Sequence, residues 1–248
     1  MTARLKEAIR HLLPARRKVH RIRSGPLAGY LIHTSWHDYP GAIRGNTETK
    51  LLEWFRQNVR PGETWLDVGA HYGYTAIALS RLVGRNGRVI AFEPVLSTAD
   101  SLECTREVNG LEQLKIVPLG LSSGSDAGVR RMAVHRGMAE ASLSNSASSE
   151  PVTTAGFDRV WESLCAADPA IHGVKIDVQG MEGLVLAGMT GALRRWKPRL
   201  VIEFHPGVER GAILDLLEGC GYDRHPEALE NSSGGIKDDK SYAFVPVR

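Results

Sequence analysis

Short hydrophobic runs alternate with longer amphipathic stretches through most of this chain. Five of the runs have the length of buried strands, and the stretches between several of them carry hydrophobic residues at helical spacing. This alternation predicts an α/β fold, with a mostly parallel sheet and helices on both of its faces. The predicted strands are residues 64–68, 88–92, 114–118, 173–177 and 199–203, the predicted helices are 46–59, 73–83, 97–109, 181–195 and 207–218, and a last hairpin is expected near 222–225 and 242–247.

Two regions depart from this alternation. Residues 1–45 are predicted to form an N-terminal extension, with a basic amphipathic helix at about 3–13 and an extended segment at about 18–33. Residues 46–248 are predicted to form the main domain. Within it, residues 122–160 are too long for a plain connection. We interpret them as an inserted β-hairpin or lid near the active site, with a surface loop as the alternative.

The bulk composition fits one α/β domain with additions, because the chain has 248 residues and 42% of them are hydrophobic. No hydrophobic run approaches the roughly 18 residues of a membrane span, and the N-terminus lacks the features of a signal peptide. The three cysteines, Cys104, Cys165 and Cys220, lie far apart, which favours free thiols over a disulfide frame or a zinc site. We therefore expect a cytoplasmic protein without a transmembrane segment.

Positive charge is concentrated at the N-terminus. Residues 1–23 hold eight of the 31 Lys and Arg residues and one acidic residue, whereas the other 225 residues carry 23 basic and 27 acidic side chains. Such an arm could contact nucleic acid or an anionic membrane. Its hydrophobic residues share one helical face, so we favour a docking helix. This helix and the exposed face of helix 46–59 are candidate surfaces for a homodimer.

The most informative segment joins the first two predicted strands. The first strand ends in the glycine-rich turn Asp67-Val-Gly-Ala-His-Tyr-Gly73, and Glu93 stands at the tip of the second strand, 26 positions after Asp67. Such a turn lets the backbone approach an adenosyl cofactor, and a strand-end carboxylate binds its ribose hydroxyls. His71 replaces the glycine that makes room for a pyrophosphate in dinucleotide-binding turns. S-adenosylmethionine (SAM), which has no pyrophosphate, is therefore the predicted cofactor, with an ordinary βαβ turn as the alternative.

Motifs at the ends of several predicted strands form a recognisable set. The most specific are Ala91-Phe-Glu-Pro94 and Lys175-Ile-Asp-Val-Gln-Gly-Met-Glu182, in this order. Together with the glycine-rich turn, they resemble the FkbM family of SAM-dependent methyltransferases over about residues 45–210. The resemblance implies a class I methyltransferase fold, with a Rossmann-like sheet of seven mostly parallel strands, and O-methylation of sugar or natural-product hydroxyls. The other motifs are 66–74, 109–110, 117–122 and 198–205.

The chain departs from the family pattern at three positions. His71 stands where the family usually has Asn, Gln179 where it usually has Glu, and Met181 where it has a small residue. A role that the family gives to the acid at the position of Gln179 does not transfer to this chain.

Ligands of an open α/β sheet lie outside the carboxyl ends of its strands. The turn after the first strand should line the methionine part of SAM. Asp67 should receive its amino group directly or through water, and the next helix should offer free N–H groups to its carboxylate. Glu93 should accept hydrogen bonds from both ribose hydroxyls, and the turn after the third strand should frame the adenine. The predicted SAM-binding residues are Asp67, Gly69, Ala70, His71, Gly73, Tyr74, Thr75, Glu93, Pro94, Gly120, Leu121, Ser122 and Asp177.

Asp177 is the residue that we expect to carry the chemistry, with a structural role in the following turn as the alternative. It ends the strand beside the glycine-rich turn, so it could align the acceptor oxygen and take its proton. Glu203 and His205 end the next strand, and with Asp177 they are candidates for catalysis or for binding a divalent metal such as Mg²⁺. A metal-free site with His205 as general base fits equally well. Lys175 shares a strand face with Asp177 and is more typical of packing.

Residues of the N-terminal region are weaker candidates. Tyr30, His37, Asp38 and Tyr39 could close over the acceptor. Glu48 could cap the helix that follows it and favour its dipole.

The predicted function is a SAM-dependent O-methyltransferase that acts on a hydroxyl of a small molecule, sugar or natural product. A nucleic-acid methyltransferase anchored by the basic arm is the alternative. Enzymes that methylate base amino groups commonly carry an Asn/Asp-Pro-Pro-Tyr/Phe loop after the fourth strand, but residues 177–180 hold no aromatic side chain to stack on a flipped base. We therefore expect no nucleic-acid partner. A SAM-binding protein without catalysis is a third hypothesis.

Overall fold

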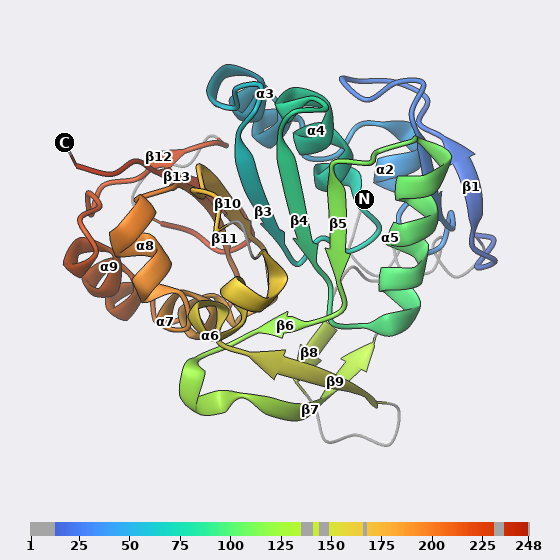
Figure 1. Ribbon diagram of the computed structural model, residues 1–248. Helices are drawn as coiled ribbons and strands as arrows, with labels where there is room; N and C mark the ends of the chain where they lie inside the picture. The colour runs from blue at the N-terminus through green and yellow to red at the C-terminus, as the bar shows by residue number, and fades with distance from the viewer. Residues whose placement is uncertain (1–12, 135–140, 144–148, 166–167, 231–235, 248) are drawn as a thin grey trace.

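A seven-stranded, mostly parallel sheet forms the centre of the molecule, as the sequence predicted (Figure 1). The computed structural model describes residues 13–134, 141–143, 149–165, 168–230 and 236–247, so the helix expected at 3–13 falls almost wholly outside the described residues. The strands are β3 Thr64–Val68, β4 Arg88–Phe92, β5 Leu114–Val117, β10 Gly173–Ile176, β11 Arg199–Phe204, β12 Glu227–Ala228 and β13 Lys240–Phe244. Their order is β12-β13-β11-β10-β3-β4-β5, and β13 runs antiparallel to both of its neighbours.

Each face of the sheet packs against its own layer of helices, because alternate strand residues point to opposite faces. Trp65 belongs to the hydrophobic cluster that includes residues of α3, α4 and α5, whereas Leu66 belongs to the cluster that includes residues of α6 to α9. Among the described residues, none of the helices has the length and hydrophobicity that a membrane span requires. The helices are α2 Pro40–Arg44, α3 Thr49–Asn58, α4 Tyr74–Val83, α5 Leu96–Val108, α6 Phe157–Leu164, α7 Glu182–Ala187, α8 Thr190–Trp196 and α9 Arg210–Gly219.

The register of three neighbouring strands gathers charged residues on one face of the sheet. Lys175 of β10 lies between Asp67 of β3 and Val201 of β11. Because side chains alternate along each strand, Asp177 and Glu203, each two residues further on, follow on that same face. Charged side chains from β3, β10 and β11 therefore meet near the carboxyl ends of the strands, where ligands of such sheets bind.

Several predicted helix boundaries were wrong. The segment 181–195 contains two helices, α7 and α8, because the chain at Gly188 passes so close to the carbonyl oxygen of Ser122 that a Cβ atom there would lie 1.9 Å from it. Helix α5 begins at Leu96, one residue before the predicted start, and has no side-chain cap. Helix α3 begins at Thr49 rather than at residue 46, and its N-cap, Glu48, makes no capping hydrogen bond with its side chain.

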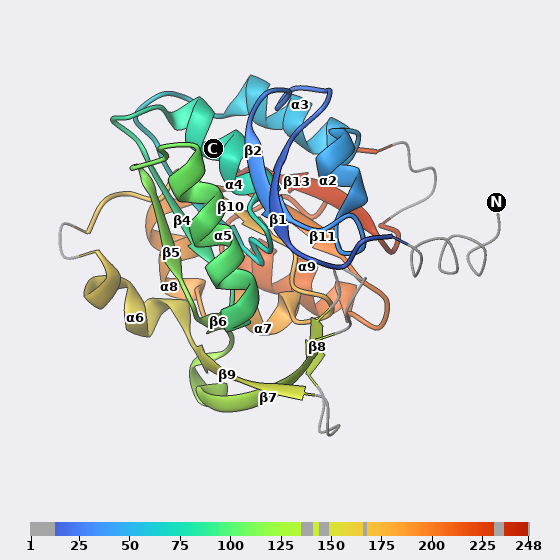
Figure 2. The same ribbon diagram turned by 90° about the vertical axis from the view of Figure 1, so that its right-hand side faces the viewer.

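The N-terminal region packs on the main domain instead of standing apart from it (Figure 2). Its hairpin consists of β1 Lys18–Arg21 and β2 Leu31–Thr34. Leu31 exchanges two hydrogen bonds with the Asn109 side chain just after α5, at 2.9 and 2.6 Å. The backbone N–H of His33 donates to the Thr105 hydroxyl at 3.0 Å. The region shares one core with α3 and α4, so the predicted domain boundary after residue 45 stays a prediction.

The predicted insert forms a second sheet at the carboxyl ends of β3, β4 and β5 (Figure 1). Its strand order is β6-β9-β7-β8. Met132 and Val152 of this sheet pack against Val95, which directly follows the motif Ala91-Phe-Glu-Pro94 at the end of β4. The end of the segment is helix α6, which the sequence analysis missed, and Phe157 of this helix packs against Phe92. The strands are β6 Gly120–Leu121, β7 Gly128–Val134, β8 Ala141–Leu143 and β9 Ser149–Ala155.

Candidate active site

A cavity of about 320 Å³ lies at the carboxyl ends of β3, β4, β10 and β11. This volume falls in the range of small-molecule sites, and polar groups converge on it from several elements. The N-terminal region contributes Arg17, Asp38 and Tyr39, and Thr47 and Glu48 follow shortly after it. The inserted sheet contributes another part of the wall. The cavity is thus enclosed by the two regions that the sequence placed outside the alternating core.

The glycine-rich turn forms one wall of the cavity and depends on both of its glycines. Gly69 has φ 78°, and a Cβ atom there would lie 1.9 Å from the carbonyl oxygen of Asp177. Gly73 has φ 93°, and a Cβ atom there would lie 2.4 Å from Leu102. His71 adopts φ 51° between them and lines the cavity. Burial lowers the pKa of His71 to about 4, so its imidazole is neutral at physiological pH.

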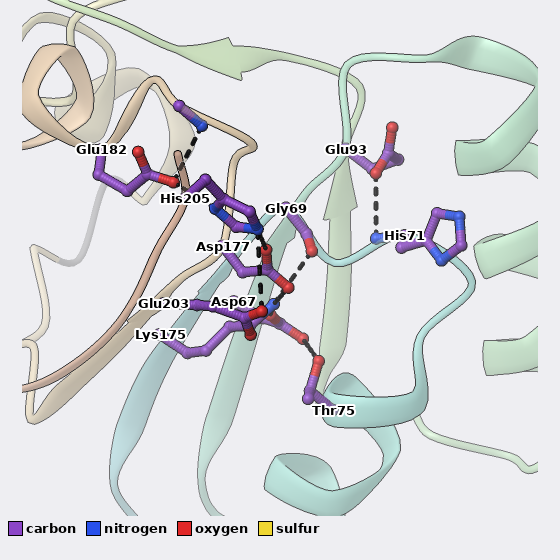
Figure 3. Close-up of polar contacts among 11 residues, drawn as sticks. Asp67, Gly69, His71, Thr75, Glu93, Lys175, Asp177, Glu182, Glu203 and His205 are labelled. Atoms are coloured by element: carbon purple, nitrogen blue, oxygen red, sulfur yellow. Dashed lines mark hydrogen bonds and ion pairs between the residues drawn. The ribbon is translucent and has the colours of Figure 1, made fainter. Parts of the chain in front are cut away.

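Glu93 lines the cavity beside this turn and is almost fully buried. Its two carboxylate oxygens accept hydrogen bonds from the backbone N–H group of His71 (Figure 3) and from that of Val95, each at 3.0 Å. Burial raises the pKa of Glu93 to about 7, although the two backbone N–H groups favour the charged form. Each carboxylate oxygen has a second lone pair, so the oriented group can still accept hydrogen bonds from a ligand.

Asp67 stands behind the cavity wall rather than in it. Its side chain is fully buried, and it accepts a hydrogen bond from the Thr75 hydroxyl at 2.7 Å. Its other oxygen lies 3.4 Å from the Lys175 ammonium. Lys175 and Thr75 line the cavity in its place. The contact of Asp67 with a methionine amino group, directly or through water, stays a prediction.

Lys175 is a buried cation at the centre of the site, not a packing residue at a sheet edge. Its ammonium lies 3.4 Å from Asp67 and 3.4 Å from Asp177, and it donates a hydrogen bond to the carbonyl oxygen of Gly69 at 3.1 Å (Figure 3). Burial lowers the pKa of Lys175, but the adjacent carboxylates of Asp177 and Asp67 outweigh burial and raise it above its ordinary value. Lys175 therefore remains charged and ties β10 to the turn after β3.

Asp177, Glu203 and His205 come together as the sequence predicted. Nε2 of His205 lies 3.5 Å from Asp177 Oδ1 and 3.8 Å from Glu203 Oε1 (Figure 3). Asp177 and Glu203 line the cavity, whereas His205 lies behind them. Burial and the charges of Asp177 and Glu48 raise the pKa of Glu203 to about 8. One atom from each of the three side chains lies within 4.8 Å of the others, so the set can hold a metal ion.

Glu182 orients this cluster, and the sequence analysis gave it no role. It is fully buried at the start of α7, and its Oε1 lies 2.8 Å from Nδ1 of His205. The same oxygen accepts a hydrogen bond from the backbone N–H of Gly180 at 3.1 Å. Burial lowers the pKa of His205, but the hydrogen bond to Glu182 and the charges of Asp177, Glu182 and Glu203 together outweigh burial and raise the pKa. No local pattern indicated this contact, because Glu182 and His205 lie 23 residues apart in the sequence.

Most of the predicted SAM-binding residues surround the cavity. Gly73 and Ser122, like Asp67, are buried without lining it. The residues that do line it are Gly69, Ala70, His71, Tyr74, Thr75, Glu93, Pro94, Gly120, Leu121 and Asp177.

The N-terminal wall includes one residue that the sequence analysis passed over. Arg17 contacts the Asp38 carboxylate at 3.2 Å and the carbonyl oxygen of Ser97 at 2.8 Å, and its guanidinium lies 5.0 Å from the centre of the Tyr72 ring. Asp38 also accepts a hydrogen bond from the Tyr72 hydroxyl at 3.0 Å. Nothing in the sequence distinguished Arg17 from the other basic residues near it.

The other candidates near the N-terminus differ in whether they line the cavity. Tyr39 lines the cavity beside Glu48, whereas Tyr30 and His37 do not. Burial and the charge of Asp177 raise the pKa of Glu48.

The chain resembles several known proteins in sequence and in fold. A protein-family model, that of the methyltransferase FkbM domain, matches residues 67–224 of this chain. The hexuronic acid methyltransferase AglP of Haloferax volcanii is 28% identical over 183 residues, which cover 71% of this chain and 69% of that protein. The solved structure of the methyltransferase FkbM from Methylobacillus flagellatus KT is 16% identical with a TM-score of 0.51, over 78% of this chain and 50% of that one.

A third relative was solved with its cofactor. Fibrillarin from Aeropyrum pernix, in complex with natively bound SAM, is 13% identical with a TM-score of 0.51, over 93% of this chain and 88% of that one. At this identity the likeness concerns the fold alone. The fold is the one that class I methyltransferases adopt. More particularly, the chain belongs to the FkbM methyltransferase family.

Proposed function

We propose that this protein transfers the methyl group of SAM to a hydroxyl oxygen of a small molecule, and that the acceptor is a carbohydrate. The observation that carries the proposal is the pairing, in one cavity, of the Glu93 carboxylate at one end with Asp177 and Glu203 at the other. The name of the related hexuronic acid methyltransferase supports a carbohydrate acceptor.

Glu93 would hold the cofactor. Its carboxylate is oriented by two backbone N–H groups and accepts hydrogen bonds from the ribose hydroxyls through its remaining lone pairs. The turn from Gly69 to His71 then lies along the methionine part. Because the His71 imidazole is neutral, it adds no positive charge that would repel the sulfonium of SAM.

Asp177 would align the acceptor and take its proton. The acceptor oxygen attacks the methyl carbon, the carbon–sulfur bond breaks, and the hydroxyl proton passes to the Asp177 carboxylate as the oxygen–carbon bond forms. S-adenosylhomocysteine and the methyl ether leave, and the proton returns to solvent. Proximity and proton transfer of this kind are the main contributions that a protein makes to such a displacement. Lys175, 3.4 Å away, keeps Asp177 in place.

The acidic side chains of the cavity favour some classes of acceptor over others. Glu48, Asp177 and Glu203 all line the acceptor end. Acidic side chains form hydrogen bonds with sugar hydroxyls in either protonation state, whereas a charged carboxylate repels a sugar carboxylate unless a cation is bound beside it. We therefore propose a neutral sugar at this end of the cavity, in contrast to the acid in the name of the related AglP protein.

A transfer assay with radiolabelled SAM tests this function. Neutral hexosides, hexuronosides and unmodified RNA would be offered in parallel at equal concentration. The proposal expects label in a neutral hexoside, at least tenfold faster than in its uronic acid counterpart. Label in RNA alone would overturn the proposed function, and a preference for the hexuronoside would overturn the charge argument.

A further inference from the structure

The carboxyl ends of β10 and β11 hold more negative charge than the nearby cation balances. Four carboxylates gather there, those of Asp67, Asp177, Glu182 and Glu203, and the single ammonium of Lys175 is shared between two of them. Asp67 and Glu182 are fully buried. Buried charges of one sign are costly unless a counter-charge or protons offset them. This part of the site is therefore built to receive positive charge.

Three ligand atoms converge on one point within this region. Nε2 of His205 faces Asp177 and Glu203, and the three side chains offer ligand atoms within 4.8 Å of one another. The His205 side chain is only 8% exposed. Oδ1 of Asp177 is a buried oxygen without a hydrogen-bond partner among the described residues. A cation between the three atoms would satisfy that oxygen, which the protein itself leaves without a donor.

Glu182 supplies an independent reason to regard His205 as a ligand. Its carboxylate lies 2.8 Å from Nδ1, so a neutral His205 donates the Nδ1 proton to Glu182 and turns the Nε2 lone pair toward Asp177 and Glu203. Histidines that bind metals almost always donate their other ring N–H to a carboxylate or a carbonyl group in this way. Without a cation or a proton, the lone pair of Nε2 would face two negative groups.

We propose that Asp177, Glu203 and His205 bind one divalent cation, and that Glu182 fixes the orientation of the imidazole. Two carboxylates and one imidazole form a mixed oxygen and nitrogen set, which suits Mn²⁺ and, with added water ligands, Mg²⁺. A divalent cation at such a site lowers the pKa of a bound hydroxyl and orients it. For this chemical use the inference rests on the proposed hydroxyl transfer, whereas the binding itself needs no acceptor.

The test is a calorimetric titration of Mn²⁺ into the full chain, stripped with EDTA, dialysed and saturated with S-adenosylhomocysteine. We expect one Mn²⁺ per chain, with Mg²⁺ competing for the same site. Asp177→Asn and Glu203→Gln should each weaken Mn²⁺ binding at least tenfold. Glu182→Ala should weaken it about 10- to 100-fold, in the range found for partners of metal-bound histidines, and Glu182→Gln, which keeps an acceptor for Nδ1, should weaken it less.

Glu227→Gln is the matched control, because Glu227 is an exposed carboxylate outside both the cavity lining and the three-residue set. Its Mn²⁺ affinity should stay within threefold of the parent, and thermal melting would show that each variant folds. Absence of Mn²⁺ binding, or equal binding in Asp177→Asn and the parent, would overturn the proposal and leave protons as the counter-charge. Mn²⁺ binding without methylation of any hydroxyl would instead overturn the proposed function alone.

Discussion

The two ends of the cavity use the same functional group in opposite ways. At one end Glu93 is a single carboxylate whose two oxygens are oriented by backbone N–H groups of His71 and Val95. At the other end Asp177 and Glu203 crowd around His205, and Oδ1 of Asp177 has no hydrogen-bond donor among the described residues. A carboxylate that the backbone fixes suits recognition of a constant ligand, whereas a crowded, under-satisfied group suits chemistry. Substitutions at the two ends should therefore affect cofactor binding and catalysis separately.

The largest effect is expected at the crowded end. Asp177→Asn keeps the shape of the side chain but removes a proton acceptor, so turnover should fall about 10³-fold, within the usual range for general acid–base groups. The dissociation constant for SAM should stay within threefold, because Asp177 contributes little to binding the adenosyl group in this account. Steady-state kinetics and calorimetry measure the two quantities. The same substitution at exposed Asp223 is the control, and unchanged turnover in Asp177→Asn would break the comparison.

Lys175 joins the two ends, and its loss should act on folding. Lys175→Met preserves length but leaves the fully buried Asp67 beside no cation. The free energy of unfolding should fall by about 3–5 kcal/mol, as when one partner of a buried ion pair is removed. Urea denaturation measures this change. Adding Asp67→Asn to Lys175→Met should restore part of the loss, and a double variant no more stable than the single one would contradict the assigned pairing.

The Glu93 end predicts a dependence of stability on pH in the ligand-free protein. Burial raises the pKa of Glu93 from 4.5 to about 7, against the opposing influence of two backbone N–H groups and the charge of Lys175. The unfolded chain releases this proton near pH 4.5 and the folded chain only near pH 7. The contribution of Glu93 to stability is therefore fully present below pH 4.5 and is lost as the pH rises through 7.

Glu93→Gln should remove this loss, which corresponds to about 3 kcal/mol. The melting temperature of the variant relative to that of the parent should therefore rise from pH 5 to pH 8, by on the order of 5 °C. Differential scanning calorimetry at the two pH values measures the gain. A parent and a variant that respond equally to pH would show that Glu93 is charged in the folded chain.

The smallest effect concerns cofactor affinity. Glu93→Gln replaces a charged acceptor by a neutral one, so the dissociation constant for SAM should rise about tenfold, in keeping with about 1.5 kcal/mol for a hydrogen bond to a charged group. Turnover at saturating SAM should stay within threefold. Glu203→Gln should show the reverse pattern and serves as the paired variant. An unchanged affinity of Glu93→Gln for SAM would contradict the proposed contact between Glu93 and the ribose hydroxyls.

The same contrast explains what the sequence could reveal. The bounds of β3 and β4 were predicted to the residue, because a buried parallel strand is a local hydrophobic run. The fold class followed from the alternation of strands and helices along the chain, and the cofactor from the glycine-rich turn and the acid at the end of the next strand. The convergence of Asp177, Glu203 and His205 was also foreseeable, since carboxyl ends of neighbouring parallel strands meet at one edge of the sheet.

The remaining features depend on contacts between distant segments. Glu182 meets His205 across 23 residues, and Arg17 reaches Ser97 across 80, so neither contact leaves a local pattern. Asp67 lies near the carboxyl end of β3, but no spacing rule shows that Lys175 and Thr75 would line the cavity in front of it. The roles in binding SAM stay predictions, because they concern contacts with a ligand.

The central claim is that the methyl group goes to a hydroxyl oxygen placed against Asp177. The most direct measurement is an NMR spectrum of the product formed from SAM labelled with carbon-13 in its methyl group and a neutral hexoside. The account predicts that the labelled carbon is bonded to a sugar oxygen, and that this signal is lost when Asp177→Asn replaces the parent enzyme. A labelled carbon bonded to nitrogen, or an undiminished signal with Asp177→Asn, would contradict it.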